Sequence, residues 1–270
     1  MATTRISGLF ETRRAQGRPG LIAYLTAGDP SPQRTPSLVE ALERGGADLI
    51  ELGVPFSDPI ADGPVIQRAS ERALAAGTTL AGVLEIAVEI RRRSRIPIVL
   101  FTYLNPVLRY GIERLARNAA SAGIDGCLLT DLSVEEAGGY VQAMRAGGLD
   151  TVFLAAPTST PRRLELVARY SSGFVYLVSR TGVTGERERL SDAVGPLVEE
   201  MRRVTSLPLA VGFGISRPEQ AAEAGRLADA AVVGSAFVRL VEHNGSCAAA
   251  ELQLESLARE MKHAMARART

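Results

Sequence analysis

Residues 21–52 read LIAYLTAGDPSPQRTPSLVEALERGGADLIEL, and this stretch contains the structural unit that the rest of the chain repeats. It holds an apolar run at Leu21–Leu25, a helix-like pattern over 34–45 and a second apolar run at Leu49–Leu52. Each run is nearly continuous in apolar residues rather than alternating, which is typical of a parallel strand covered on both faces. The stretch therefore predicts one strand–helix–strand unit of a parallel sheet.

The same unit recurs along the rest of the chain. Further candidate strands are Ile98–Phe101, Gly126–Leu129, Thr151–Leu154, Phe174–Val178, Leu209–Val211 and Ala230–Val233. Helix-like segments follow at 80–94, 111–122, 134–147, 161–170, 191–204, 217–225 and 247–267, with start signals at Ser133, Thr160-Pro161 and Arg217-Pro218. Eight units in 270 residues predict an α/β fold, a (β/α)8 TIM barrel that occupies 1–270 as a single domain. A doubly wound sheet is the alternative, and it would need fewer strands or a second domain.

Three extra helices are expected beside the regular eight. One covers roughly Ile6–Arg14, precedes the first strand and would cap the barrel floor. The second is an insertion at 63–77 after strand two, and the third is Ser235–Glu242 after strand eight. The last two follow the carboxyl ends of strands, where barrels place their active sites.

Charge and composition exclude several classes of protein. The formal net charge is +1, so neither nucleic acid nor an anionic membrane is expected as the main partner. Residues 1–10 hold no continuous apolar segment, and no apolar stretch approaches the roughly 18 residues of a membrane span. Cys127 and Cys247 are the two cysteines, and Cys127 lies in an apolar run where a reduced, buried thiol is expected. These features favour a cytoplasmic protein.

Basic catalytic groups are almost missing from the chain. Lysine occurs once, at Lys262, and histidine occurs at His243 and His263, all near the carboxyl terminus. The predicted barrel therefore offers no amine and no imidazole for chemistry.

Glycine-bearing segments follow strands six, seven and eight, at 181–185, 212–216 and 234–236. Barrels commonly bind a phosphate between the loops after strands seven and eight and the start of a short extra helix. Glycine lets backbone N–H groups approach an anion, and a helix start adds partial positive charge. The segments predict a phosphate site that relies on backbone amides, Ser235 and either Ser216 or an arginine; ordinary turns are the alternative.

Acidic residues gather at the end of strand two. Glu51 stands inside an apolar strand, where a lone carboxylate must be hydrogen-bonded or shifted in pKa. Such a group suits general acid–base chemistry near neutral pH, whereas an ion pair with an arginine at the rim is the structural alternative. In the loop that follows, Asp58 is expected to cap a turn, and Asp62 could either do the same or reach over the barrel mouth.

The residue inventory limits the chemistry further. Oxygen ligands from Glu51, Asp58, Asp62 and Asp131 would suit Mg²⁺, but no barrel histidine can complete a zinc or iron site, and no metal is expected. A Schiff-base aldolase needs a barrel lysine, and an isomerase of the triosephosphate type pairs its carboxylate with a histidine. Carboxylate acid–base chemistry on a phosphorylated substrate remains.

At these residues the chain strongly resembles the tryptophan synthase alpha subunit family. The matching segments run in order across nearly the whole chain, and the one around strand two is highly specific. They are Leu25–Pro30, Glu51–Pro64, Thr102–Leu108, Gly182–Gly185, Gly212–Ser216 and Gly234–Ala236. A departure is Thr130-Asp-Leu-Ser133, where family members often have Pro-Asp-Leu-Pro near the partner interface.

The resemblance implies retro-aldol cleavage of indole-3-glycerol phosphate to indole and glyceraldehyde 3-phosphate. It assigns Glu51 as the catalytic acid and base and Asp62 as the second catalytic carboxylate, which would bind the indole N–H. The remaining implied contacts divide between substrate and phosphate. Substrate contacts would come from Tyr176, Phe101, Leu128, Thr184 and Phe213, and phosphate contacts from Gly185, Gly214, Gly234 and Ser235. Plain barrel packing is the alternative for the pocket walls.

The resemblance also implies a partner. Family members form an alpha2beta2 heterotetramer, in which indole passes to a beta subunit that carries pyridoxal phosphate, so no cofactor is expected in this chain. Three alternatives remain open: a stand-alone lyase, a catalytically silent regulatory subunit, and a phosphosugar isomerase, which the missing histidine and lysine disfavour.

Overall fold

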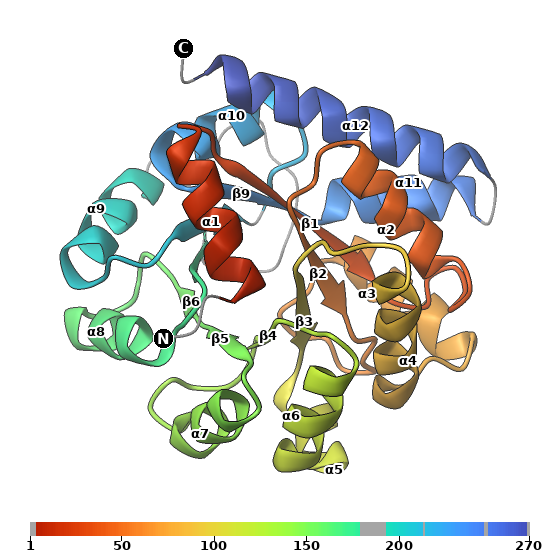
Figure 1. Ribbon diagram of the computed structural model, residues 1–270, viewed down its shortest axis with the longest axis horizontal. Helices are drawn as coiled ribbons and strands as arrows, with labels where there is room; N and C mark the ends of the chain where they lie inside the picture. The colour runs from red at the N-terminus through yellow and green to blue at the C-terminus, as the bar shows by residue number, and fades with distance from the viewer. Residues whose placement is uncertain (1–3, 179–192, 213, 246–247, 269–270) are drawn as a thin grey trace.

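The computed structural model describes residues 4–178, 193–212, 214–245 and 248–268. Its strands are all parallel and form one sheet in the order β5-β4-β3-β2-β1-β9-β8-β7-β6 (Figure 1). The strands are β1 (Gly20–Thr26), β2 (Leu49–Gly53), β3 (Ile98–Thr102), β4 (Gly126–Leu129), β5 (Asp150–Val152), β6 (Leu154–Ala155), β7 (Val175–Val178), β8 (Leu209–Gly212) and β9 (Ala230–Val233).

The sheet closes on itself through a strand that is broken in two. Only Phe153 separates β5 from β6; β5 pairs with β4, and β6 pairs with β7. The nine segments therefore occupy eight strand positions, and the predicted TIM barrel is confirmed. Thr151–Leu154 was expected as one strand, and the break occurs where the Phe153 ring packs between the rings of Tyr140 and Tyr170.

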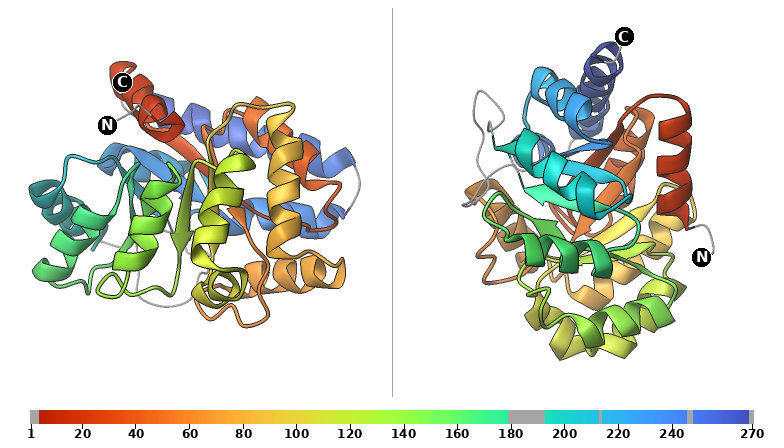
Figure 2. Two further views of the ribbon diagram at one scale, coloured as in Figure 1. Left: turned by 60° about the horizontal axis from the view of Figure 1, so that its bottom comes forward. Right: turned by 90° about the vertical axis from the view of Figure 1, so that its left-hand side faces the viewer.

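Helices surround the barrel on its outside (Figures 1 and 2). They are α1 (Arg5–Ala15), α2 (Thr35–Arg44), α3 (Pro64–Ala75), α4 (Leu80–Arg91), α5 (Leu104–Tyr110), α6 (Ile112–Ser121), α7 (Gly138–Ala146), α8 (Pro161–Tyr170), α9 (Val194–Val204), α10 (Pro218–Leu227), α11 (Ser235–Asn244) and α12 (Ala248–Arg267). The extra helices expected after strands two and eight are α3 and α11.

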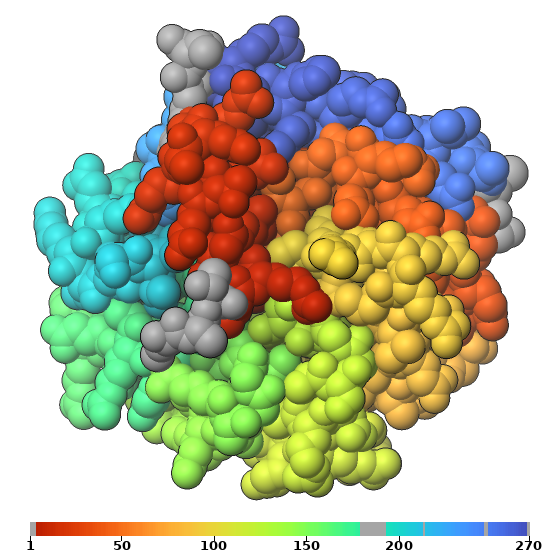
Figure 3. Space-filling view, viewed as in Figure 1, coloured from red at the N-terminus to blue at the C-terminus, as the bar shows by residue number. Residues whose placement is uncertain are grey.

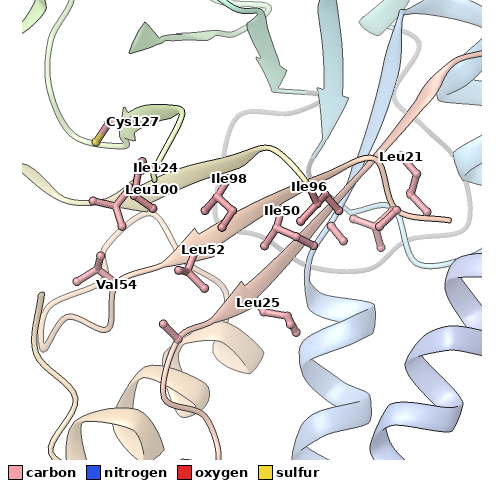
Figure 4. Packing of buried hydrophobic residues seen from close by; sticks show 14 of the residues in the cluster. Leu21, Leu25, Ile50, Leu52, Val54, Ile96, Ile98, Leu100, Ile124 and Cys127 are labelled. Atoms are coloured by element: carbon pink, nitrogen blue, oxygen red, sulfur yellow. The ribbon is translucent and has the colours of Figure 1, made fainter. Parts of the chain in front are cut away.

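Strand side chains alternate between two apolar layers, although the strands are apolar almost throughout. The outer layer lies between strands and helices and includes Leu25, Leu52 and Leu100 (Figure 4). The inner layer fills the barrel and includes Ile22 and Tyr24 of β1. This parity follows from the period of two along a strand, and it places Glu51, between the outward Ile50 and Leu52, inside the barrel.

The floor of the barrel is closed by α1, as expected. Ile6 and Phe10 are buried, and the Phe10 ring lies 5.8 Å from the ring of Phe174, just before β7. The space-filling view shows α1 lying over this end of the molecule (Figure 3). Burying two such side chains stabilises the fold by about 2 kcal/mol each. The opposite end of the barrel is thereby left for the site.

Two helix expectations were wrong in detail. The segment 134–147 was expected to begin behind Ser133, but α7 begins at Gly138, because the Ser133 hydroxyl donates to the carboxylate of Glu135 instead of capping the first turn. The short helix α5 was not expected at all. The side chain of Asp131 accepts a 2.7 Å hydrogen bond from the backbone of Leu104 and so supports the start of α5 from another loop.

Candidate active site

Glu51 is a buried carboxyl group inside the barrel. It lies on β2, where the register places it opposite Tyr24 of β1 and Val99 of β3, and its side chain is 1% exposed. Among the described residues, none forms a hydrogen bond with its Oε1 and no arginine pairs with its carboxylate, so the ion pair considered as an alternative is not seen there. Burial raises the pKa of Glu51 to about 8, because ionisation would leave a charge without solvent. At neutral pH the group is therefore mainly a carboxylic acid that can give up a proton.

Asp62 reaches the barrel mouth from the loop after β2. Its Oδ2 accepts a 2.9 Å hydrogen bond from the hydroxyl of Tyr103, and the backbone N–H of Ala61 donates to the same tyrosine oxygen at 3.1 Å. Burial raises the pKa of Asp62 to about 6, although the Tyr103 hydrogen bond opposes that rise. Asp62 is thus mainly ionised at neutral pH. The two carboxyl groups therefore differ in protonation: Glu51 can donate a proton, and Asp62 can accept a hydrogen bond.

Both carboxyl groups face one cavity at the carboxyl ends of the strands. Its walls bring together residues from β1, β2, β3, β7 and β9, the start of α3, and the loops after β2, β8 and β9. They are Tyr24, Glu51, Asp62, Ile66, Phe101, Tyr176, Gly214, Ile215, Val232, Gly234 and Ser235. Burial first, and then the negative charges of Glu51 and Asp62, raise the pKa of Tyr176 well above its usual value. Ionisable groups from separate strands therefore converge at this cavity.

Two glycines make room for the tyrosines of this cavity. A Cβ at Gly53 would lie 2.2 Å from the Tyr24 hydroxyl, and a Cβ at Gly212 would lie 2.1 Å from the Tyr176 hydroxyl. Neither separation is possible for real atoms, so a larger residue at either position would force the ring to move. The glycine that ends each of these strands thus lets a neighbouring tyrosine lie across the barrel mouth.

The glycine segments after the neighbouring strands β8 and β9 meet on one side of the cavity. Gly214 has a φ of +92°, a backbone conformation that glycine adopts without strain, and Gly234 directly precedes α11. The first turn of α11, beginning at Ser235, brings backbone N–H groups and the positive end of the helix dipole to this side. An anion can therefore bind in the same cavity as the carboxyl groups.

The remaining expected residues have varied positions. Tyr176 and Phe101 line the cavity, whereas Leu128 is fully buried in the inner layer beside them and does not line it. Thr184, Gly185 and Phe213 lie outside the described residues. Asp58 is exposed and accepts from Ser57, in keeping with a turn.

Sequence reasoning missed several residues of the site. Tyr24, Ile66, Ile215 and Val232 line the cavity, and Tyr103 holds Asp62. Tyr24 alone carries a local signal, because its hydroxyl interrupts an apolar strand at an inward position.

A larger cavity, of about 630 Å³, lies at the opposite end of the barrel, between α1 and the floor. Two of its carboxylates are already engaged: Asp150 accepts from the Thr4 hydroxyl, and Asp229 pairs with Arg202. Because barrels place their active sites at the carboxyl ends of strands, the smaller cavity with Glu51 and Asp62 is the candidate site.

Comparison with known proteins identifies the family. The sequence pattern of the family described as "Tryptophan synthase alpha chain" matches residues 10–266. The chain belongs to the tryptophan synthase alpha chain family. The tryptophan synthase alpha chain of Solibacter usitatus is 71% identical over 259 residues, which are 96% of this chain and 97% of that one. The one from Citrifermentans bemidjiense is 52% identical and covers 88% of this chain and 90% of its own length.

Solved structures of tryptophan synthase share the fold. A chain of the Mycobacterium tuberculosis tryptophan synthase superposes with a TM-score of 0.90 at 38% identity, covering 97% of this chain and 98% of its own. The alpha subunit from Legionella pneumophila also gives a TM-score of 0.90, at 35% identity, and covers 98% of this chain and all of its own. As a tryptophan synthase alpha chain, the protein is a lyase subunit of tryptophan biosynthesis, with a substrate and a beta subunit as partners.

Two further features concern metal binding and membrane spans in the described part of this tryptophan synthase alpha chain. Within the described ranges, no group of three or more His, Cys, Asp or Glu side chains is arranged to hold a metal ion. None of the described helices is by itself both long and apolar enough to cross a membrane. Helices α3 and α4 reach that length and apolar composition only when taken together, and they are bent by 94° relative to each other.

Proposed function

We propose that this chain cleaves indole-3-glycerol phosphate to indole and glyceraldehyde 3-phosphate, with Glu51 and Asp62 as its catalytic residues. The observation that carries the proposal is a cavity that combines the buried carboxyl group of Glu51, the carboxyl group of Asp62 held by Tyr103, and a helix start. A substrate with an indole at one end and a phosphate at the other matches these groups.

Glu51 moves the proton in both halves of the reaction. In the first half it protonates carbon 3 of the indole, which becomes an indoleninium, and Glu51 becomes a carboxylate. In the second half this carboxylate removes the proton of the adjacent glycerol hydroxyl. The electron pair of that O–H bond forms the aldehyde, the carbon–carbon bond breaks, and its electron pair restores the indole ring. Glu51 ends protonated, so the cycle balances.

Asp62 stabilises the charge that develops between these two steps. Its carboxylate accepts the hydrogen bond of the indole N–H, which carries positive charge in the indoleninium. Because Asp62 is 5% exposed and held by Tyr103, it needs little rearrangement when that charge appears. This differential interaction lowers the barrier rather than merely tightening ground-state binding.

The remaining residues hold the two ends of the substrate. Phe101, Tyr176 and Phe213 would pack around the indole, with Leu128 supporting this wall from the inner layer, and Thr184 would help to close the site. Gly214, Gly234 and Ser235, with Gly185, would bind the phosphate through backbone N–H groups and one hydroxyl. Support comes from Gly214, Gly234 and Ser235, which line the same cavity as Glu51.

We also propose that the chain is one domain of a cytoplasmic alpha2beta2 complex and passes indole to a beta subunit that carries the pyridoxal phosphate. The membership of all described strands in one sheet supports the single domain. A stand-alone lyase would have the same site, and it would be distinguished by full activity of the isolated chain without a beta subunit. A silent regulatory subunit is disfavoured, because it has no need to keep Glu51 and Asp62 buried at a cost in stability.

The test is release of indole from indole-3-glycerol phosphate, measured with and without the beta subunit. We expect slow release by the isolated chain and faster release in the complex. Glu51→Gln should abolish release while its circular dichroism spectrum stays that of the parent, and Asp62→Asn should reduce release severely. Normal turnover by Glu51→Gln would refute the assignment, and equal rates with and without beta would favour the stand-alone lyase.

A further inference from the structure

The segment Leu25–Pro30 matches the family but has no role in the chemistry above. It forms a tight turn after β1, in which Gly28 has a φ of +86° and a Cβ there would fall 1.9 Å from the Thr78 hydroxyl. The backbone N–H of Gly28 donates to the Thr35 hydroxyl at 2.9 Å. This turn leaves the Asp29 side chain 3% exposed and directs it at α3.

Asp29 begins a chain of ion pairs that crosses three βα segments. Arg72 of α3 donates from Nε and Nη2 to the two Asp29 oxygens, both at 2.8 Å, and from Nη1 to Oε1 of Glu242 at 2.9 Å. Arg68, one turn earlier on α3, donates to the two Glu242 oxygens at 2.6 and 2.9 Å. Each carboxylate thus accepts at least two hydrogen bonds, and α3 is tied to both the β1 turn and α11.

The two helices joined in this way begin at different parts of the cavity lining. Helix α3 begins at Pro64, directly after the loop that carries Asp62, and its Ile66 lines the cavity. Helix α11 begins at Ser235 on the proposed phosphate side. Near the cavity they belong to one apolar cluster through Ile66, Ala69 and Val238, and farther away they are joined by the ion pairs. Because the two kinds of contact lie at different distances from the cavity along the helices, together they fix the separation of α3 and α11 and their relative tilt.

We propose that Asp29, Arg72 and Glu242 are positioning residues, which set the distance between the Asp62 side of the site and the phosphate side. The inference rests on the proposed function. A substrate tethered by its phosphate and bound through its indole needs both contacts at once, so a change in that distance weakens the second contact even when each site is intact. A ligand that occupies one side alone should not sense the change.

This difference between ligands gives the test. Binding is measured for two probes: an indolyl-alkyl phosphate that lacks the reacting hydroxyl and spans both sides, and glycerol phosphate, which occupies the phosphate side. The main variant is Glu242→Gln, which weakens the link between α3 and α11 and leaves Asp29 paired with Arg72. We expect it to bind the spanning probe about tenfold more weakly and glycerol phosphate unchanged, with KM raised and kcat lowered.

Further variants separate positioning from folding. Arg72→Lys keeps the charge but loses the fork between Asp29 and Glu242, so it should show a loss for the spanning probe alone. Arg92→Met removes an exposed ion pair with Glu89 on α4 and is the matched control; it should bind both probes like the parent. Melting temperatures of all variants report on stability independently of binding.

Each result decides the proposal. If Glu242→Gln binds both probes like the parent, or loses affinity for both equally, these residues do not position the two sides. If the parent chain itself fails to bind the spanning probe, the proposed function is wrong and this inference falls with it. A loss confined to the spanning probe in Glu242→Gln and Arg72→Lys, but not in Arg92→Met, supports it.

Discussion

The hydroxyl of Tyr103 donates a 2.9 Å hydrogen bond to Asp62, across 41 residues of sequence. Tyr103 immediately follows β3 and precedes α5, whereas Asp62 lies in the loop after β2. The same hydroxyl accepts from the backbone of Ala61, and the Tyr103 ring lies 5.2 Å from that of Phe56. One side chain therefore holds the loop that carries the second carboxylate and also stabilises that carboxylate in its ionised form.

Tyr103→Phe should raise the pKa of Asp62 above about 6, because the hydrogen bond that favours the ionised form is lost. The acid limb of the pH profile of kcat/KM should move to higher pH, and kcat/KM at neutral pH should fall about tenfold. Tyr110→Phe, which removes a hydroxyl that accepts from Asn118 outside the site, is the control. An unchanged acid limb in Tyr103→Phe would show that this hydrogen bond does not govern Asp62.

The pH dependence of kcat/KM should be bell-shaped. Asp62 acts ionised, so activity is lost as pH falls through about 6, and Glu51 acts protonated, so activity is lost as pH rises through about 8. Asp62→Asn should lack the acid limb of its residual activity and keep the alkaline one. Steady-state rates across this range check the prediction, and a profile without an alkaline limb would contradict the role of Glu51 as an acid.

Glu51→Gln should stabilise the fold at alkaline pH. Burial raises the pKa of Glu51 from 4.5 to about 8, so the folded state holds a proton that the unfolded state releases in this window. Its contribution to stability is full below pH 4.5 and is lost as pH rises to about 8. Glutamine has no such loss, so the free energy of unfolding of Glu51→Gln, relative to that of the parent, should be about 5 kcal/mol higher above that window than below it. Urea unfolding at both ends of the window measures this difference.

If the free energies of unfolding of Glu51→Gln and the parent differ by the same amount at both pH values, Glu51 does not titrate on unfolding. Glu85→Gln, on the outer surface of α4, is a control that should show no pH-dependent gain.

Lys262→Met should destabilise the fold and leave the activity of the folded protein unchanged. The ammonium group on α12 pairs with Asp48 and donates to the carbonyl of Pro19 at 3.1 Å, and Asp48 also accepts from Arg13 and from the backbone of Leu21. These contacts join both ends of the chain at the barrel floor. Removing the amine leaves a buried carboxylate with less compensation, at a cost of about 2 kcal/mol.

The midpoint of urea unfolding and the kcat per folded molecule check this prediction together. Arg259→Met, which removes an exposed pair with Glu255 on the same helix, should change the midpoint little. A changed KM in Lys262→Met would contradict a purely structural role.

Much of the fold could be predicted because its signals are local. The apolar runs of β1, β2 and β3 are visible in the sequence, and so is the proline that opens α8 behind the Thr160 cap. Helix α5 was not predicted, because Asp131, distant in the sequence, supports its first turn. The start of α7 was predicted wrongly, because the Ser133 hydroxyl donates to Glu135 and does not cap the helix.

The candidate site divides in the same way. Glu51 was predictable, because a carboxyl group within an apolar strand must be hydrogen-bonded or shifted in pKa. Tyr103 and Ile66 were not, because nothing in their own segments distinguishes them from ordinary core residues. Their role depends on neighbours that other loops supply.

The sequence alone was enough to predict the barrel and to place Glu51 on its second strand, since the length of an apolar run is a local property. The inward direction of Glu51, the protonation of Glu51 and Asp62, and the link from Asp29 through Arg72 to Glu242 became evident only in the folded chain. Desolvation depends on every group that excludes water from a carboxyl, and the Arg72–Glu242 contact joins residues 170 positions apart. No local sequence pattern encodes the desolvation of a carboxyl group or a contact over such a distance in the sequence.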